Sequence, residues 1–269
     1  MKQERFSTIA VAILALAMAL DVGLLGWTQY AMDRAIVEAE EASKPAEIEL
    51  TLIAPDDCEE CIDGKLLLAE IEKEDVRVIA SERLTSSSQE GVVVIDAYAI
   101  TRLPAVIVKG EYDKENVASV FETLAGAVRG DALVIEVQQP VYVDVATGDV
   151  IGLVDVTYIT DSRCADCYDP VAHKTILQNA FGMTIDHEEM VDARSSYGMD
   201  LIETYNITQT PTVLLSSSAN AYAKLLQVWQ TVGTVEADGT FVFRKSASMG
   251  NVTYYDIETG MIIRPETQD

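Results

Sequence analysis

Apolar and polar positions along this chain form a series of strand-like and helix-like segments that occurs twice. Short β-rich apolar runs predict strands, and apolar positions spaced three to four residues apart predict helices. In the first half the predicted strands are 48–53, 76–80 and 105–108, and the predicted helices are 62–73, 92–98 and 114–128. In the second half the strands are 154–159, then 184–185 or 190–192, and 212–215, and the helices are 170–180, 199–205 and 219–231. Residues 235–243 add a hairpin with Asp238 and Gly239 in its turn.

The two halves also share residues. An offset of 107 positions superposes eight identical residues within 19 positions, which in the first half are Ser88, Gly91, Ile95, Tyr98, Ile100, Thr101, Pro104 and Val106. Each half closes on a similar segment, YVDVATGDV at 142–150 and YYDIETGMI at 254–262, where we expect a hairpin. Such repetition indicates two homologous domains, which we place at 47–152 and 153–269.

Residues 1–30 predict a membrane anchor. Residues 6–27 are apolar with a single charge, Asp21, and a run of this length can span a bilayer. Lys2 and Arg5 precede the run, so the positive-inside rule places the N-terminus in the cytoplasm and the bulk of the chain outside. The alternative is a signal peptide cleaved near Ala17-Met18-Ala19, which would make the protein secreted.

The charge composition of the chain indicates which binding partners to expect. The chain has 19 basic and 44 acidic side chains and a formal net charge of -25. Nucleic-acid binding requires clustered lysine and arginine, so we expect no nucleic-acid partner. Residues 31–46 are polar and helix-prone up to Pro45, and we expect them to form a stalk or linker before the first domain.

Two CxxC pairs carry the candidate chemistry, Cys58 with Cys61 and Cys164 with Cys167. Each pair lies between the first predicted strand and the first predicted helix of its domain. The thiolate is the nucleophile in disulfide exchange, and a helix N-terminus lowers the pKa of a thiol beside it. The acidic residues around both pairs act in the opposite direction and predict a weakly oxidising disulfide. Arg163, next to Cys164, partly offsets these acids and favours the second pair as the more reactive one.

The order strand, CxxC, helix, strand, helix, X-Pro, strand resembles the thioredoxin fold, and its tandem form resembles the protein disulfide oxidoreductases. The resemblance implies an α/β protein with two tandem thioredoxin-like domains, each a central mixed sheet flanked by helices, behind an N-terminal transmembrane helix. It also implies cis peptide bonds at Leu103-Pro104 and Thr210-Pro211, where these residues would shape a substrate groove. The chain departs from the family pattern because no Trp precedes either pair. In addition, Leu52 and Tyr158 stand where thioredoxins carry a buried acid.

The motif and the resemblance together predict a membrane-anchored, extracytoplasmic thiol–disulfide oxidoreductase acting on the thiols and disulfides of proteins. Cys58 and Cys164 would attack, and Cys61 and Cys167 would resolve the mixed disulfide, without a cofactor or a metal. The alternative is a non-catalytic interaction module whose disulfides are structural. A shared four-cysteine zinc site would require the two pairs to meet. His173 is expected to be a surface or packed residue.

Overall fold

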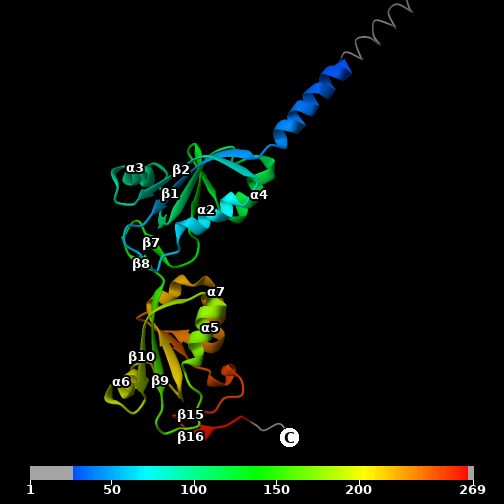
Figure 1. Ribbon diagram of the computed structural model, residues 1–269. Helices are drawn as coiled ribbons and strands as arrows, with labels where there is room; N and C mark the ends of the chain where they lie inside the picture. The colour runs from blue at the N-terminus through cyan, green and yellow to red at the C-terminus, as the bar shows by residue number, and fades with distance from the viewer. Residues whose placement is uncertain (1–26, 266–269) are drawn as a thin grey trace, which may run out of the picture.

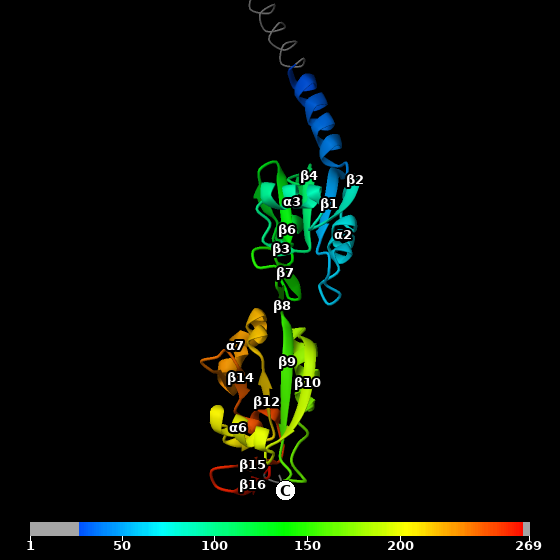
Figure 2. The same cartoon turned by 90° about the vertical axis from the view of Figure 1, so that its left-hand side faces the viewer.

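The computed structural model describes residues 27–265. An exposed helix over residues 27–42 leads into two α/β domains that follow one another along the molecule (Figures 1 and 2). The helix-prone part of the predicted stalk is therefore helical. The predicted membrane segment at 6–27 lies almost wholly outside the described residues. None of the helices within residues 27–265 has the length and apolar content that a membrane span requires.

The first domain is built on a five-stranded mixed sheet with the order β2-β1-β4-β6-β5. Its strands are β1 (Ala46–Ala54), β2 (Val76–Thr85), β4 (Ala105–Gly110), β5 (Ala127–Arg129) and β6 (Ala132–Glu136), and only β1 and β2 are parallel. Its helices are α2 (Gly64–Glu72), α3 (Gln89–Ala97) and α4 (Glu115–Thr123). Leu52 of β1 packs in one apolar cluster with residues of α2 and α4, whereas Ile53 packs in another with Ile95 of α3. Because successive strand residues point to opposite faces, helices cover both sides of the sheet.

The second domain repeats this architecture with the sheet order β10-β9-β12-β14-β13. Its strands are β9 (Leu153–Thr160), β10 (Thr184–Asp192), β12 (Thr212–Leu215), β13 (Gly233–Val235) and β14 (Phe241–Phe243). Its helices are α5 (Ala172–Phe181), α6 (Ser196–Thr204) and α7 (Ala223–Val232), with short 3-10 turns at Ser217–Ala221 and Ser246–Met249. Residues of α5 and α7 share one core cluster, and residues of α6 pack against the other. The α/β fold with two mixed sheets flanked by helices is thus confirmed.

Each domain carries a second, three-stranded antiparallel sheet at one end. In the first domain it has the order β3-β7-β8, from Arg102–Leu103, Tyr142–Asp144 and Val150–Ile151. In the second domain it has the order β11-β15-β16, from Gln209–Thr210, Tyr254–Asp256 and Met261–Ile263. The hairpins predicted at 142–150 and 254–262 are confirmed, and each pairs with the two residues before the proline loop.

Several predicted boundaries differ from those in the structure, and three differences have a clear local cause. The helix predicted over 114–128 ends at Thr123, and Ala127–Arg129 form β5 instead. Ala125 has a positive φ of 55°, and a side chain at Gly126 would collide with Leu133, so the chain turns there into a strand. The helix predicted over 219–231 is a 3-10 turn followed by α7. Strand β10 is continuous from Thr184 to Asp192. A register shift between Ile185 and Glu188 interrupts the alternation of apolar and polar residues by which a strand is recognised in the sequence.

The repeated serine and glycine residues have a local structural role. Ser88 and Ser195 are the N-caps of α3 and α6, and each side chain accepts a hydrogen bond from the backbone N–H of Gly91 or Gly198. A Cβ atom at Gly198 would lie 2.0 Å from the carbonyl oxygen of Asp192, and one at Gly91 would lie equally close to that of Thr85. The helix therefore starts tightly against the preceding loop, and only glycine fits there.

We therefore expect Gly198→Ala to destabilise the second domain by about 1 to 2 kcal/mol, because overpacking outweighs the better helix propensity of alanine. Urea unfolding followed by the fluorescence of Trp229 measures this, since Trp229 is 4% exposed in the second domain and Trp27 is 72% exposed. Asp200→Ala, on the exposed side of the same helix, is the control and should stay within about 0.5 kcal/mol of the wild type. A Gly198→Ala protein as stable as this control would contradict the prediction.

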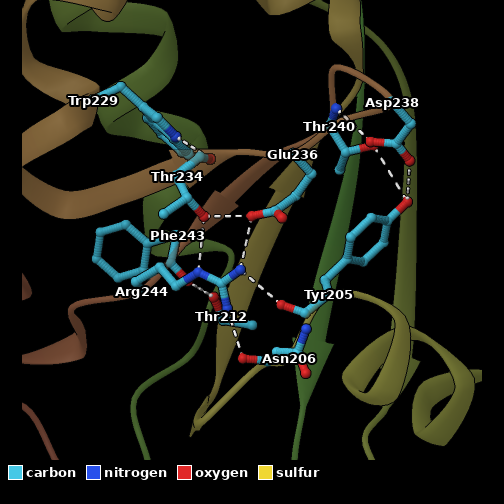
Figure 3. Close-up of polar contacts among 10 residues, drawn as sticks. All are labelled: Tyr205, Asn206, Thr212, Trp229, Thr234, Glu236, Asp238, Thr240, Phe243 and Arg244. Carbon is cyan, nitrogen blue, oxygen red and sulfur yellow. Dashed lines mark hydrogen bonds and ion pairs between the residues drawn. The ribbon is translucent and has the colours of Figure 1, made fainter.

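An arginine closes the C-terminal end of the second helix in both domains. In the second domain, Arg244 donates to the carbonyl oxygens of Tyr205 and Asn206 and pairs with Glu236 (Figure 3). In the first domain, Arg129 donates to the carbonyls of Tyr98 and Ala99 and pairs with Glu136. When the two sheets are superposed by their strand pairing, Arg129 in the first domain is equivalent to Glu236 in the second, and Glu136 is equivalent to Arg244. The positive and the negative side chain have therefore exchanged strands between the two domains. The repeated Tyr98 and Tyr205 hydrogen-bond to Asp131 and Asp238, which gives these tyrosines a structural role.

This exchange predicts a charge-swap rescue in the first domain. Arg129→Glu alone should destabilise it by about 2 kcal/mol, since it removes charged hydrogen bonds and sets two carboxylates together. Adding Glu136→Arg should restore most of the loss, because an arginine at that position reaches the same carbonyls in the second domain. Hydrogen exchange of the β6 amides in increasing urea measures the effect. A double variant no more stable than the single one would show that the two arginine positions are not equivalent.

Candidate functional site

Each CxxC pair lies in a loop and not at a helix start. Strand β1 ends at Ala54, and α2 begins at Gly64 behind the N-cap Asp63, so Cys58 and Cys61 precede the first helical turn. In the second domain, β9 ends at Thr160 and α5 begins at Ala172, several residues beyond Cys167. The expectation that each pair lies at a helix N-terminus was therefore wrong: Cys61 lies two residues before the N-cap Asp63, and Cys167 lies four residues before the N-cap Val171.

Both pairs form disulfides, with S–S distances of 2.05 Å for Cys58–Cys61 and 2.07 Å for Cys164–Cys167. Their exposure differs. Cys58, Cys61 and Cys167 are partly exposed, whereas Cys164 is buried with 5% of its surface accessible. Access is a requirement for thiol attack, and Cys164, which was expected to attack, is less accessible than Cys58.

The four residues predicted to shape a substrate groove lie at the proline loops. The Leu103-Pro104 and Thr210-Pro211 peptide bonds are cis, the isomer that the resemblance implied. All four residues are buried. The backbone of Leu103 pairs with Val143 of β7, and that of Thr210 pairs with Tyr255 of β15. Any partner that uses this edge must therefore replace one of the chain's own hairpins.

A buried acid that sequence reasoning did not assign organises the second site. Asp161 has a fully buried side chain, and it accepts hydrogen bonds from the backbone and guanidinium of Arg163 and from the hydroxyl of Thr210, at 2.6 Å. Burial alone would raise the pKa of Asp161, but these hydrogen bonds outweigh it and hold the pKa below its ordinary value. Arg163 also stacks over the ring of Tyr255, with 4.0 Å from the guanidinium carbon to the ring centroid.

These contacts change the roles expected of Asp161 and Arg163. In the sequence, Asp161 is one of the acidic residues around Cys164, which Arg163 was expected to offset in part. In the structure they neutralise one another and connect the CxxC loop to the proline loop. The only sequence signal was the neighbouring pair of opposite charges, and the partners Thr210 and Tyr255 are far away in the chain.

The first domain lacks this network. Pro55 and Asp57 stand in place of Asp161 and Arg163, and Leu103 and Val143 replace Thr210 and Tyr255. Asp56 is held instead by the hydroxyls of Ser86 and Ser87 and the backbone N–H of Ser87, and the Ser86 hydrogen bond lowers its pKa. The three-stranded sheet at the end of each domain is here called the accessory sheet. The Cys58–Cys61 loop is joined to the segment that enters this sheet through the Ile62 N–H, which donates to the carbonyl oxygen of Val141.

His173 is packed under the second loop, which is one of the two placements expected for it. It is 5% exposed, lies edge-on against Phe243, and has its Nε2 3.3 Å from the hydroxyl of Tyr168. The Tyr168 hydroxyl donates to the carbonyl of Pro211 at 2.9 Å. Burial lowers the pKa of His173 to about 4.

Leu52 and Tyr158, which stand where thioredoxins carry a buried acid, are not ionised. Leu52 is buried in the first core. Tyr158 is buried in the second, and its hydroxyl donates to Glu188 at 2.8 Å. Burial, and then this hydrogen bond, raise the pKa of Tyr158, so it stays protonated and does not act as a base near neutral pH.

The two CxxC loops lie against different accessory sheets. The first contacts the segment before β7 at the junction of the domains, and the second contacts the segment before β15 near the C-terminal end (Figure 1). The four sulfur atoms are therefore not gathered in one place. Among the described residues, Asp155, Asp186 and His187 are close enough to share a cation, but all three are exposed.

Known proteins resemble this chain only weakly in sequence and in structure. No protein-family model matches the chain, and no curated protein matches it. A mutant of the alkylhydroperoxide reductase AhpF from Enterococcus faecalis aligns at 15% identity, over 69% of this chain and 88% of that chain, with a TM-score of 0.23. ERdj5 in crystal form I aligns at 11% identity over 68% of this chain and 25% of that chain, with a TM-score of 0.18.

Each half has the thioredoxin-like topology by itself. The strand order, the helices on both faces, the CxxC pair after the first strand and the proline before the next core strand occur in each half. The chain is therefore a tandem of two thioredoxin-like domains.

Proposed function

We propose that the protein is a thiol–disulfide oxidoreductase and that Cys58–Cys61 is its exchanging disulfide. The observation that carries the proposal is the exposure of this pair. It is a disulfide between residues three apart, in a partly exposed loop at the end of β1. A sulfur atom that solvent reaches can also be reached by the thiolate of another protein.

The reaction follows ordinary disulfide exchange. In the reduced protein, the Cys58 thiolate attacks one sulfur of a substrate disulfide, and the other substrate sulfur leaves as a thiolate. The Cys61 thiolate then attacks the Sγ of Cys58, forms the intramolecular disulfide and releases the second substrate thiolate. Two electrons pass from the CxxC pair to the substrate, and the reverse sequence oxidises a substrate dithiol.

The proposed location is the outer face of a membrane. The apolar run at 6–27, with basic residues before it, supports an anchor, and the exposed helix over 27–42 supports a stalk between anchor and domains. Disulfides persist in such extracytoplasmic compartments. Secretion after cleavage of a signal peptide would leave the same domains in the same compartment.

A second function is favoured for the Cys164–Cys167 disulfide, which would serve as a structural staple of an interaction module. Its support is the burial of Cys164 and the network that joins Asp161, Arg163 and Thr210. These contacts shield Cys164 from thiols in solution, whereas Cys167 is partly exposed.

Equilibrium redox titration of the full chain tests both assignments. The chain is equilibrated in glutathione and dithiothreitol buffers, free thiols are alkylated, and each pair is quantified by peptide mass spectrometry. We expect Cys58–Cys61 to titrate between about -120 and -270 mV, the range of working oxidoreductases, and Cys164–Cys167 below about -300 mV. A Cys58Ser/Cys61Ser variant is the control for the second pair. If the first pair also resists reduction below about -300 mV, the oxidoreductase proposal fails.

A further inference from the structure

The C-terminal segment 253–264, here called the strap, lies across the Cys164–Cys167 loop. Three positions of the loop contact it. The Arg163 guanidinium stacks over the Tyr255 ring at 4.0 Å, the Tyr168 N–H donates to the carbonyl of Thr253 at 3.0 Å, and Arg264 lies 3.3 Å from a carboxylate oxygen of Asp166. The contacts therefore fall before, within and after the CxxC pair.

The strap also occupies the backbone edge before Pro211. Its strand β15 pairs with β11, with Thr210 opposite Tyr255 and Gln209 opposite Asp256. The Ile257 N–H then donates to the carbonyl of Thr208 at 2.9 Å. An extended peptide adds to a sheet through such an edge, and here the chain's own C-terminal segment already fills it.

The first domain provides an internal comparison. Its hairpin β7-β8 pairs with β3 in the same way, but Val143 and Asp57 replace the stacked Tyr255 and Arg163. Among the described residues, no ion pair or ring contact joins that hairpin to loop 56–61. Cys58 is correspondingly partly exposed, whereas Cys164 is 5% exposed. The side-chain contacts of the strap thus coincide with burial of the cysteine.

The strap is weakly held compared with the domain that it covers. No residue of 253–264 is buried, and its strands β15 and β16 have three residues each. A hairpin of this size is marginal by itself, and segments with little buried surface open at a lower free energy than the domain core.

We propose that the strap is an autoinhibitory segment that controls access of thiols to the Cys164–Cys167 disulfide. While it is closed, Cys164 is only 5% exposed, and an external thiolate reaches the pair only at the partly exposed Cys167. When it opens, the thiolate attacks one sulfur, a mixed disulfide forms and the other cysteine leaves as a thiolate; a second external thiolate completes the reduction. This inference concerns the second pair and holds whether or not Cys58–Cys61 exchanges disulfides with proteins.

Site-resolved reduction kinetics test the proposal. The oxidised full chain is treated with excess dithiothreitol, which supplies both electrons, and samples are alkylated at intervals and analysed by peptide mass spectrometry. In the wild type, Cys164–Cys167 should be reduced more slowly than Cys58–Cys61. Tyr255→Ala should accelerate the second pair about three- to thirtyfold, the range that corresponds to loss of a cation–π contact. The first pair should be unchanged.

Two variants are matched controls. Tyr255→Phe keeps the ring under Arg163, and Met261→Ala truncates an exposed strap side chain, so both should reduce at the wild-type rate. The proposal is overturned if the two wild-type pairs are reduced at equal rates. It is also overturned if Tyr255→Ala has no effect, or if it accelerates both pairs equally.

Hydrogen exchange of the wild type provides a test without substitutions. The amides of Tyr168 and Ile257 are both bonded through the strap. They should exchange at a common rate, faster than the amides of β9, if the strap opens by itself. If the Tyr168 amide exchanges only together with β9, the strap opens only when the domain unfolds, and the proposal is wrong.

Discussion

Asp161→Ala is expected to lower the free energy of unfolding of the second domain by about 3 kcal/mol. Breaking a buried ion pair by removing one partner costs about 3 to 5 kcal/mol. The low end applies here because the side chain of Arg163 remains 30% exposed, while that of Asp161 is fully buried. The variant also leaves the buried hydroxyl of Thr210 without its acceptor.

Urea unfolding monitored through Trp229 measures this loss. Asp166→Ala is the matched control, since Asp166 is in the same loop but its side chain is 74% exposed and makes one ion pair; its effect should be below about 1 kcal/mol. Asp161→Asn should fall between the two, because an amide oxygen still accepts from Thr210. If Asp161→Ala and Asp166→Ala are equally mild, Asp161 does not organise this loop.

His173 is expected to make the second domain less stable as the pH falls from 7 to 4.5, by about 2 kcal/mol. Its pKa in the folded protein is about 4, below the value of about 6.5 for an unfolded chain. Between these two values the unfolded state binds the proton and the folded state does not. Stability therefore decreases as the pH falls through this window and is fully present above it.

The comparison with His173→Gln isolates this contribution. The variant is expected to be less stable than the wild type at pH 7, because it loses the edge-on contact with Phe243, and this difference should shrink toward pH 4.5. Asp161 is ordinarily protonated only below about pH 4, and its pKa is lowered further, so its loss occurs at lower pH. Parallel stability curves for the two proteins between pH 7 and 4.5 would contradict the buried, neutral histidine.

Local patterns predicted most of the fold. The strand and helix order, both terminal hairpins and the repeat depend on hydrophobic spacing and on turn residues that are close in sequence. The repeated Ser88 and Ser195 are N-caps and the repeated Gly91 and Gly198 fit tight helix starts. These identities record local backbone requirements, although the helices predicted from the sequence began three residues too late, at 92 and 199.

The errors occurred where a local pattern was ambiguous. The helix predicted over 114–128 was extended because Ala127 and Val128 continue an apolar spacing, and only their pairing with β6 makes them a strand. The CxxC pairs were placed at helix starts by the resemblance. In the structure the helices begin later, at Gly64 and Ala172, so the cysteines lie in the loops before them.

The sequence by itself determined the two thioredoxin-like domains, the two CxxC pairs and the proline of each domain, because each of these features depends on residues that are close together in the chain. Only the tertiary structure decided how the two sites differ. The burial of Cys164 accompanies contacts among Asp161, Thr210 and Tyr255, which lie in three separate segments, and the first domain has apolar residues or proline at those positions. A contact between distant segments depends on how the chain folds back on itself, and no periodicity along the chain encodes it.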